Sequence, residues 1–293
     1  MLGLRPFYCL LVRAGQAWNE DYAFSMAAAI AFYTVFSLAP LLVIVIAVAG
    51  ALFGEEAVRG EIVRQIDSLI GTQGAEMVQA LVASASDTER GLFASVLSVA
   101  VLLVGATTVF AELQSSLDRI WQVPERERPS GVTGIVRARL LSFGLILGVA
   151  FLLMASLVVS AALAALGTWA GGLLPAWERL LWFINIAVSL GMFTLLFAMI
   201  FKMLPSTRIA WRDVWVGSLV TAVLFEIGKL LIGLYLGRGG VTESLRAAGS
   251  VVVLLAWVYY ASLIFLFGAE FTRAFADYEG SRSGKPEAAE ATG

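Results

Sequence analysis

The residues best suited to chemistry in this sequence are Glu226 and Lys229, which stand in the apolar stretch FEIGKLLIGLYL at 225–236. Two opposite charges three residues apart share one face of a helix, so their side chains can meet and partly neutralise each other. A lone charge at the centre of a membrane helix costs about 2.5–3.5 kcal/mol. Such a pair is therefore either a binding or relay site in a wet pathway or a structural pair that fixes helix packing, and the spacing leaves both interpretations open.

The neighbours of the pair predict which way it faces. Small and charged residues follow one another at steps of three or four along one helical face, namely Ser218, Ala222, Glu226, Lys229, Gly233 and Gly237. The other faces carry large aliphatic side chains that suit lipid tails. Because small residues let another helix or a cavity come close, we expect the pair to point into the protein.

Two further helical faces could join the pair in lining a pathway. They carry Tyr33, Ser37 and Pro40 on one segment, and Thr108, Glu112, Ser115 and Arg119 on another. Pro40 frees a backbone carbonyl, which either kinks the helix or helps to coordinate a ligand. Tyr33 and Ser37 could equally serve helix packing, and Glu112 with Arg119 could form an interfacial pair at a helix end. Our hypothetical substrate-binding or pathway residues are Glu226, Lys229, Tyr33, Ser37, Pro40, Thr108, Glu112 and Arg119.

The residue types that are missing argue against much other chemistry. The sequence has no histidine and one cysteine, Cys9, which disfavours disulfides, thiolate or imidazole metal sites and any mechanism that needs an imidazole base. We therefore expect no catalytic residue, no metal and no cofactor, and expect that the protein is not an enzyme. A net charge of -2 gives no basic balance that would attract nucleic acid.

The elements that would position these residues are membrane helices. The chain is 59% apolar, whereas a soluble domain is about 45–50% apolar with glycine included. A spanning helix needs about 20 mostly apolar residues, and six segments qualify: about 27–53, 92–111, 140–166, 180–201, 214–236 and 250–270. The predicted fold is all-α: a polytopic integral membrane protein with six transmembrane helices in one domain, 1–276, and a disordered polar cytoplasmic tail, 277–293.

The distribution of basic residues predicts the orientation of the spans. Thirteen Lys and Arg fall on the side of the termini and six on the other side, so both termini are predicted to be cytoplasmic. In the first outward loop, 54–91, apolar residues recur at helical spacing on either side of Gly71 and Gly74, which predicts two short amphipathic helices. Glu270 ends the last predicted span, and we expect it to be solvated at the inner surface.

Three segments carry a family resemblance: AFYTVFSLAPLL at 31–42, LPSTRIAWRDVWVGSLVTAVLFEIGK at 204–229 and LLAWVYYASLIFLFGAEFTRAF at 254–275. Together they resemble the YihY/virulence factor BrkB family of bacterial inner-membrane proteins, over about residues 20–276. The resemblance implies six spans in the same order. Some members have carried the name ribonuclease BN, but the lack of histidine, of a metal-ligand cluster and of a basic face argues against that chemistry here.

The residues and the resemblance together favour a multi-pass protein of the bacterial inner membrane that transports a solute or translocates a lipid or anion. Lys229 would attract an anionic group and Glu226 would tune or relay charge. The expected partners are membrane lipids and an anionic small molecule or lipid head group, and we expect no nucleic acid. A homo-oligomer is possible. The GxxxG motif from Gly144 to Gly148 suits self-association and internal packing equally. The alternative is a non-transporting membrane scaffold or envelope assembly factor, in which the charge pair holds helices together.

Overall fold

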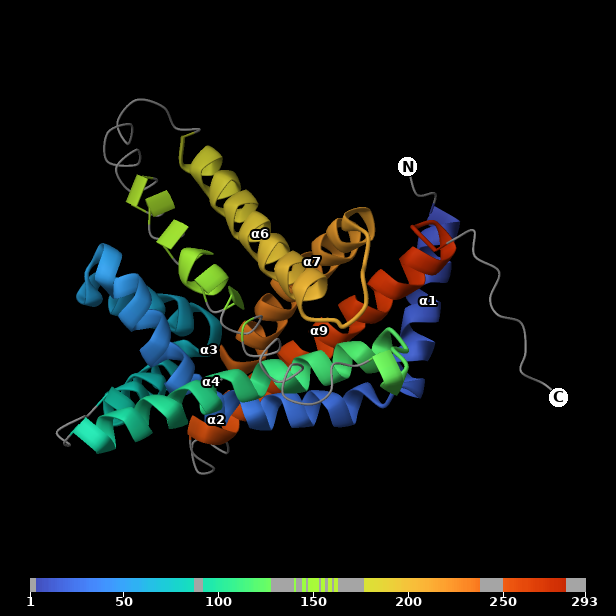
Figure 1. The fold of residues 1–293 in the computed structure, drawn as a ribbon. Helices are drawn as coiled ribbons and strands as arrows, with labels where there is room; N and C mark the ends of the chain where they lie inside the picture. The colour runs from blue at the N-terminus through green and yellow to red at the C-terminus, as the bar shows by residue number, and fades with distance from the viewer. Residues whose placement is uncertain are drawn as a thin grey trace.

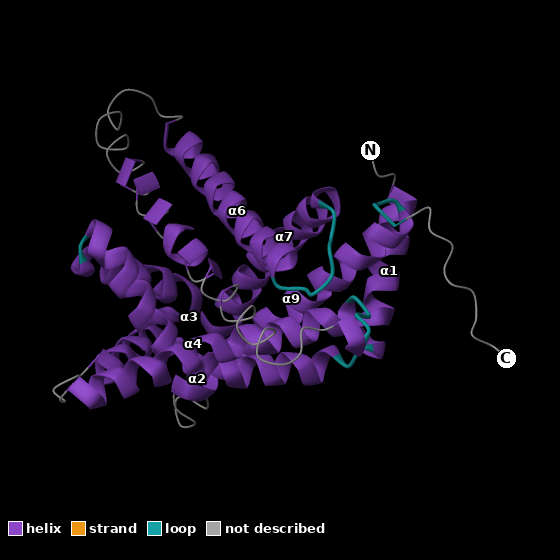
Figure 2. Cartoon of the chain, in the orientation of Figure 1, coloured by secondary structure: helices purple, strands orange, loops and turns teal. Residues whose placement is uncertain are grey.

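The computed structural model describes residues 4–86, 92–127, 177–237 and 250–282, with short stretches between 140 and 162. Every regular element in these ranges is helical (Figures 1 and 2). The helices are α1 (Leu4–Glu20), α2 (Ala23–Phe53), α3 (Glu55–Ser86), α4 (Leu92–Ile120), the 3-10 turn η1 (Glu125–Glu127), α6 (Trp177–Met203), α7 (Trp211–Gly237) and α9 (Ser250–Tyr278).

Four described helices are long and apolar enough to cross a membrane. Their apolar parts are Ala23–Ala51, Phe183–Met203, Trp211–Leu231 and Leu254–Tyr278. They confirm the predicted spans at 27–53, 180–201, 214–236 and 250–270. The first and last residues of each span agree with the prediction to within a few residues, except that the last span ends later than predicted. α4 begins at Leu92, where the second predicted span begins.

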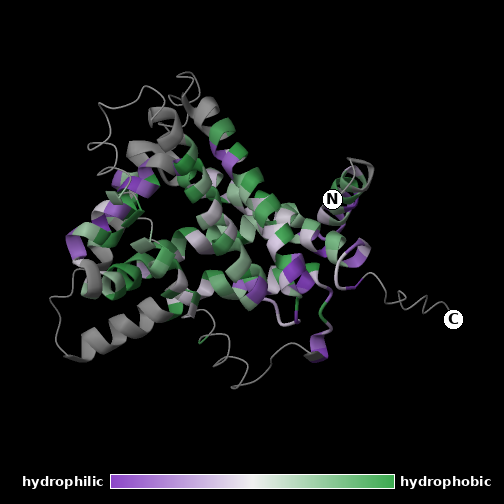
Figure 3. Ribbon diagram, turned by 90° about the horizontal axis from the view of Figure 1, so that it is seen from above, coloured by the Kyte–Doolittle hydropathy of each residue, from purple (hydrophilic) through white to green (hydrophobic). Residues whose placement is uncertain are grey.

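Most of the third predicted span, 140–166, lies outside the described residues, so the total of six spans and the cytoplasmic termini stay predictions. Figure 3 shows hydrophobic residues running through the middle of the molecule, with most hydrophilic residues toward its edges. Together with the four helices that are long and apolar enough to cross a membrane, this pattern indicates a multi-pass membrane protein.

The helices pack around α9. It lies against α7, α2 and α1 over long stretches and against α3 and α4 over shorter ones, while α6 packs on α7 (Figure 1). The largest buried apolar cluster joins α2, α3, α4, α6, α7 and α9, and a smaller one of Leu10, Ala14, Phe271 and Phe275 joins α1 to α9. The two helices nearest the chain ends, α1 and α9, thus lie side by side.

Reciprocal glycine–threonine contacts set the distance between α7 and α9. A Cβ on Gly217 of α7 would lie 1.8 Å from Oγ1 of Thr272, and a Cβ on Gly268 of α9 would lie 2.0 Å from Oγ1 of Thr221. The hydroxyls of Thr221 and Thr272 donate at 2.7 Å to the carbonyls of Gly217 and Gly268, four residues earlier on their own helices. The hydroxyls are therefore satisfied inside the contact, and the two backbones approach as closely as small residues permit.

The predicted outward loop folds differently from our expectation. The prediction of two short helices is wrong, because one helix, α3, runs from Glu55 to Ser86. Gly71 and Gly74 each cost about 1 kcal/mol of helix propensity relative to alanine, but they keep the backbone N–H that proline would remove. Burial of Val58, Ile62 and Val78, together with packing on α2 and α9, offsets that cost.

Both ends of the described chain extend beyond the predicted elements. The amphipathic helix α1 was not among the predicted elements; it buries Leu10 against α9 and leaves Tyr8 exposed. At the other end α9 continues to Tyr278, past the predicted start of the tail at 277. The N–H and hydroxyl of Ser281 then donate to the buried carboxylate of Asp213, at 3.2 and 2.5 Å from its Oδ2. Residues 283–293 lie outside the described part.

The glycine–threonine contact predicts that Gly268→Val destabilises the protein. Its side chain would be forced into Thr221, and overpacking of this kind costs about 1–3 kcal/mol. The measurement is thermal unfolding of the detergent-solubilised protein. Gly191→Val in α6 is the matched control, because nothing lies within 4 Å of a Cβ at Gly191. Equal losses in the two variants would contradict a tight α7–α9 contact.

Candidate functional site

The predicted charge pair on α7 is formed. Nζ of Lys229 lies 2.8 Å from Oε2 of Glu226. Oε1 of Glu226 accepts a hydrogen bond of 2.7 Å from the hydroxyl of Ser189, and Nζ of Lys229 lies 4.8 Å from the ring centre of Phe193. Because Ser189 and Phe193 both belong to α6, the pair links α7 to α6 by an ion pair, a hydrogen bond and a cation–π contact.

The pair is only partly covered. The side chain of Glu226 is 26% exposed and that of Lys229 is 23% exposed, whereas Ser218 and Ala222, earlier on the same face, are fully buried. Glu226 stands 15 residues into α7, about 22 Å along the helix axis from its start. The face predicted from small residues is therefore packed near the start of α7 and becomes accessible deep within the span.

The other six predicted residues lie on α2 and α4, and two contacts fix how these helices align. A Cβ on Gly105 of α4 would lie 3.0 Å from Cγ of Pro40, and Met26 of α2 shares a pocket with Arg119. The two contacts are 14 residues apart on each helix, from 26 to 40 and from 105 to 119. An antiparallel pair with this register places 33 at the level of 112 and 37 at the level of 108.

These residues differ in what their side chains do. Ser37 is buried, Tyr33 is exposed, and Pro40 fills the space that Gly105 leaves. The hydroxyl of Thr108 donates to the carbonyl of Val104 at 2.8 Å, within its own helix. Their positions suit helix packing at least as well as ligand contact.

A pocket of about 280 Å³ opens between α2 and α4, toward the end of α4. Its lining consists of Met26, Glu112, Ser115, Ser116 and Arg119. Glu112 and Arg119 are thus brought to one pocket, two turns apart, and the guanidinium of Arg119 lies 5.4 Å from the ring centre of Tyr22. The hydroxyl of Ser116 is buried and has no hydrogen-bond partner among the described residues.

The structure separates the predicted residues into two groups. α6 and α7 lie on one side of α9, and α2 and α4 lie on the other (Figure 1). Glu226 and Lys229 meet α6, whereas the pocket with Glu112 and Arg119 belongs to the α2–α4 interface. The described contacts therefore do not join the three predicted faces into one lining.

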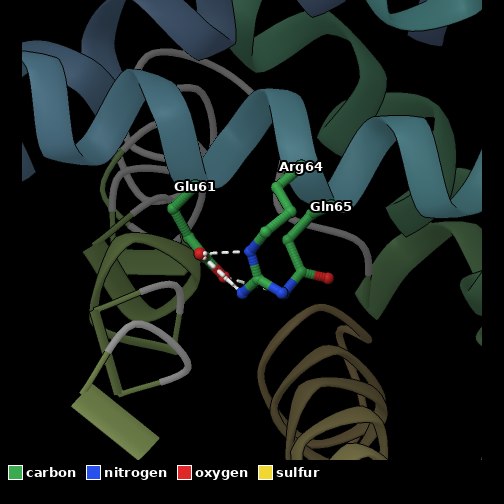
Figure 4. Close-up of polar contacts among 3 residues, drawn as sticks. All are labelled: Glu61, Arg64 and Gln65. Atoms are coloured by element: carbon green, nitrogen blue, oxygen red, sulfur yellow. Dashed lines mark hydrogen bonds and ion pairs between the residues drawn. The ribbon is translucent and has the colours of Figure 1, made fainter. Parts of the chain in front are cut away.

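A polar cluster on α3 was missed by sequence reasoning. Oε2 of the buried Glu61 accepts hydrogen bonds from Arg64, at 3.0 Å from Nε and 2.6 Å from Nη2, and Oε1 accepts one of 2.9 Å from Gln65 (Figure 4). The three side chains project from the same side of α3 (Figure 4). Their spacing of three and four residues was the available signal.

The sequence also did not predict the hydrogen bonds that hold the short connection between α6 and α7. The buried carboxylate of Asp118, near the end of α4, accepts hydrogen bonds of 2.7 Å from both the N–H and the hydroxyl of Ser206. Lys202 donates to the carbonyl of Ile209. These bonds fix the connection at 204–210 on α4, and so position the start of α7.

The expectation for Glu270 is wrong. Its side chain is 1% exposed, and neither carboxylate oxygen has a hydrogen-bond donor among the described residues. The apolar run ends at Ala269, but the helix continues for two more turns to Tyr278 and other helices cover this level. Among the described residues, no group of three or more acidic or cysteine side chains is arranged to hold a metal ion.

Comparison with known proteins places the chain among membrane proteins named without an activity. A UPF0761 membrane protein of Verminephrobacter eiseniae is 28% identical over 88% of this chain and 60% of its own length. One of Cronobacter sakazakii is 33% identical over 64% of this chain and 62% of its own, and one of Alteromonas mediterranea is 27% identical over 87% and 83%. The chain thus spans about 60% of the first two relatives, and no solved structure matches it.

The family match extends over nearly the whole sequence. Residues 14–292 match the family described as virulence factor BrkB. This range includes every membrane-spanning helix of the described structure and all eight candidate site residues. The chain therefore belongs to the virulence factor BrkB family of membrane proteins.

Proposed function

We propose that the protein moves an anionic small molecule or a lipid head group across the bacterial inner membrane, along a water-lined face that contains Glu226 and Lys229. The protein acts by transport rather than by covalent chemistry in this proposal, with both termini in the cytoplasm. The accessibility of the charge pair deep within α7 carries the proposal.

The physical argument concerns what the accessible part of the pair faces. At about 22 Å along a spanning helix, exposed atoms face either lipid tails or water. Charged groups in hydrocarbon are costly, so spanning helices turn them toward the bundle interior or a wet cavity. Glu226 and Lys229 each keep about a quarter of their side chain uncovered, which supports a wet cavity beside α7.

The contacts of the pair suit transient anion binding. Among the described residues, Lys229 contacts one carboxylate and one aromatic face, and these contacts leave hydrogens of its ammonium group for a passing anion. Glu226 offsets the charge of Lys229, so the bound anion would be held weakly enough to leave. The α2–α4 pocket, with Arg119, offers a second cationic group nearer the predicted cytoplasmic side.

The scaffold alternative has its own support in the structure. α6 packs on α7, and Glu226 and Lys229 provide polar bonds between these two helices. A pair that serves only as a link between helices would remain dry. Hydration of the pair therefore distinguishes the two functions.

Hydration can be measured with a single cysteine at Ser189. In a Cys9→Ser background, Ser189→Cys places a thiol beside Glu226 at a distance set by the present 2.7 Å hydrogen bond. We expect an impermeant maleimide to label it in membranes, because maleimides react with a hydrated thiolate.

Ile227→Cys is the matched control. Ile227 neighbours Glu226 in sequence and is more exposed, at 48%, but it lies on the aliphatic side of α7. Its thiol should stay unlabelled in membranes and react after the protein is denatured. Absence of labelling at Ser189→Cys from either side would reject a pathway beside the pair.

A mutant cycle tests the role of the pair itself. Glu226→Gln or Lys229→Met alone strands the other charge, and we expect either to lower stability by about 1–3 kcal/mol, with a smaller loss in the double variant. Thermal unfolding measures this. A double variant as unstable as the sum of the single variants would contradict the pairing.

The same variants, in proteoliposomes, test transport. We expect Lys229→Met to reduce flux at least tenfold, and the double variant, though better folded, to remain inactive. Radiolabelled phosphate serves as the probe for a small anion, and a fluorescent short-chain phosphatidylglycerol serves as the probe for a lipid head group. Wild-type protein that moves neither probe, with the thiol at Ser189 dry, would favour the scaffold function.

A further inference from the structure

The pocket between α2 and α4 contains an acidic and a basic side chain that do not neutralise each other. Glu112 and Arg119 both line it, but neither takes part in an ion pair among the described residues. They stand two turns apart on α4, so their Cα atoms are separated by about 10 Å along the helix axis. Charged side chains on one helix pair directly at a spacing of three or four residues. The pocket therefore presents a carboxylate and a guanidinium to whatever fills the space between them.

The turn between α1 and α2 holds Arg119 at the pocket. The guanidinium lies 5.4 Å from the ring centre of Tyr22. Tyr22 has a φ of 58°, in the left-handed region that residues other than glycine rarely adopt. A cation–π contact is an attraction to the face of the ring and needs no hydrogen bond. Among the described residues no hydrogen bond occupies the N–H donors of Arg119, so they remain for an anionic group.

Two adjacent serines follow Glu112 on the pocket wall. Ser115 is exposed, whereas Ser116 is buried and its hydroxyl has no partner among the described residues. Buried hydroxyls nearly always have a hydrogen-bond partner. An oxygen-rich group in the pocket would supply that partner and would accept from Ser115 as well.

The size and position of the pocket limit what it can hold. Its volume of about 280 Å³ is at the lower end for small-molecule sites, which begin at about 300 Å³. Glu112 directly follows the predicted span 92–111, and Tyr22 is 64% exposed beside Arg119. Tyrosine rings favour the level of the lipid head groups. The pocket thus suits a ligand of head-group size at the membrane surface.

We propose that the α2–α4 pocket binds an amino-alcohol phosphate, a zwitterion in which a short carbon chain joins an ammonium group to a phosphate. Arg119 binds the phosphate through its N–H donors, the serines donate to other phosphate oxygens, and Glu112 accepts from the ammonium group. A simple anion would face Glu112, and a simple cation would face Arg119. An amino acid is too short, because its two charged groups are attached to the same carbon atom.

The ligand is either the head group of a membrane phospholipid or a free solute of the same chemistry. The site goes beyond the proposed transport function, because it contains neither Glu226 nor Lys229 and binding needs no movement across the membrane. Lys229→Met should therefore bind the zwitterion like the wild type, whatever its effect on flux.

Native mass spectrometry of the delipidated full-length protein tests the phospholipid as the source. The protein is mixed with equal amounts of phosphatidylethanolamine, which carries the ammonium group, and phosphatidylglycerol, which lacks it. We expect Glu112→Gln to lower the ratio of bound phosphatidylethanolamine to phosphatidylglycerol about fivefold, the effect of one partly exposed ion pair. Glu125→Gln is the matched control, because Glu125 is exposed just after α4 and does not line the pocket. It should leave the ratio unchanged.

Equilibrium dialysis with radiolabelled phosphoethanolamine tests the free solute as the source. We expect binding to fall about fivefold in Glu112→Gln and to stay unchanged in Glu125→Gln. A response in this measurement alone would assign the site to a solute, and a response to the lipids would assign it to a phospholipid. If Glu112→Gln matches Glu125→Gln in both measurements, the zwitterion site is overturned.

A variant that keeps both charges guards against indirect effects. Ser115→Trp fills the pocket from an exposed position, so it should fold normally and weaken binding of the zwitterion about as much as Glu112→Gln does. Unchanged binding in Ser115→Trp would place the ligand elsewhere and overturn the proposal. Retention of the wild-type elution volume on gel filtration verifies folding of each variant.

Discussion

The close approach of α7 and α9 is the constraint on which the rest of the structure depends. Lipid tails are as apolar as leucine, so helices in a membrane associate through tight packing rather than through the hydrophobic effect. Gly217 against Thr272 and Gly268 against Thr221 supply that packing at two successive levels. With α7 fixed on one side, α9 offers its remaining faces to α1 and α2, and α6 is held by α7 and by the packing of Phe197 and Phe201 on Phe265 of α9.

The fixed α7–α9 contact also decides where polar groups can lie. Thr221 and Thr272 point into the contact, so the charged pair on α7 must occupy another face, and it meets Ser189 and Phe193 of α6. On α9, Gly268 and Thr272 face α7, which leaves Glu270 on the opposite side of the helix, one turn before Arg273 and its contact with Asp21. The positions of both acidic groups thus follow from one helix contact.

Sequence reasoning located the elements because long apolar runs and the three-residue spacing of Glu226 and Lys229 depend only on local geometry. It missed α1, whose apolar stripe is too narrow to resemble a span, and it missed the continuation of α9 beyond 270, because charged residues enter the helix before it ends. It also left open which neighbour each face meets. The pairing of Glu226 with Ser189, and of Pro40 with Gly105, depends on helix packing that periodicity does not encode.

Arg273 of α9 links the turn between α1 and α2 to the end of α4. Arg273 donates to the carbonyl of Ile120 at the end of α4 and also lies 3.8 Å from the carboxylate of Asp21, in the turn between α1 and α2. One turn before Ile120, Ser116 lines the pocket that contains Arg119. Arg273 therefore ties the α1–α2 turn to the end of α4, beside the α2–α4 pocket, whereas α9 lies between this pocket and the Glu226–Lys229 pair.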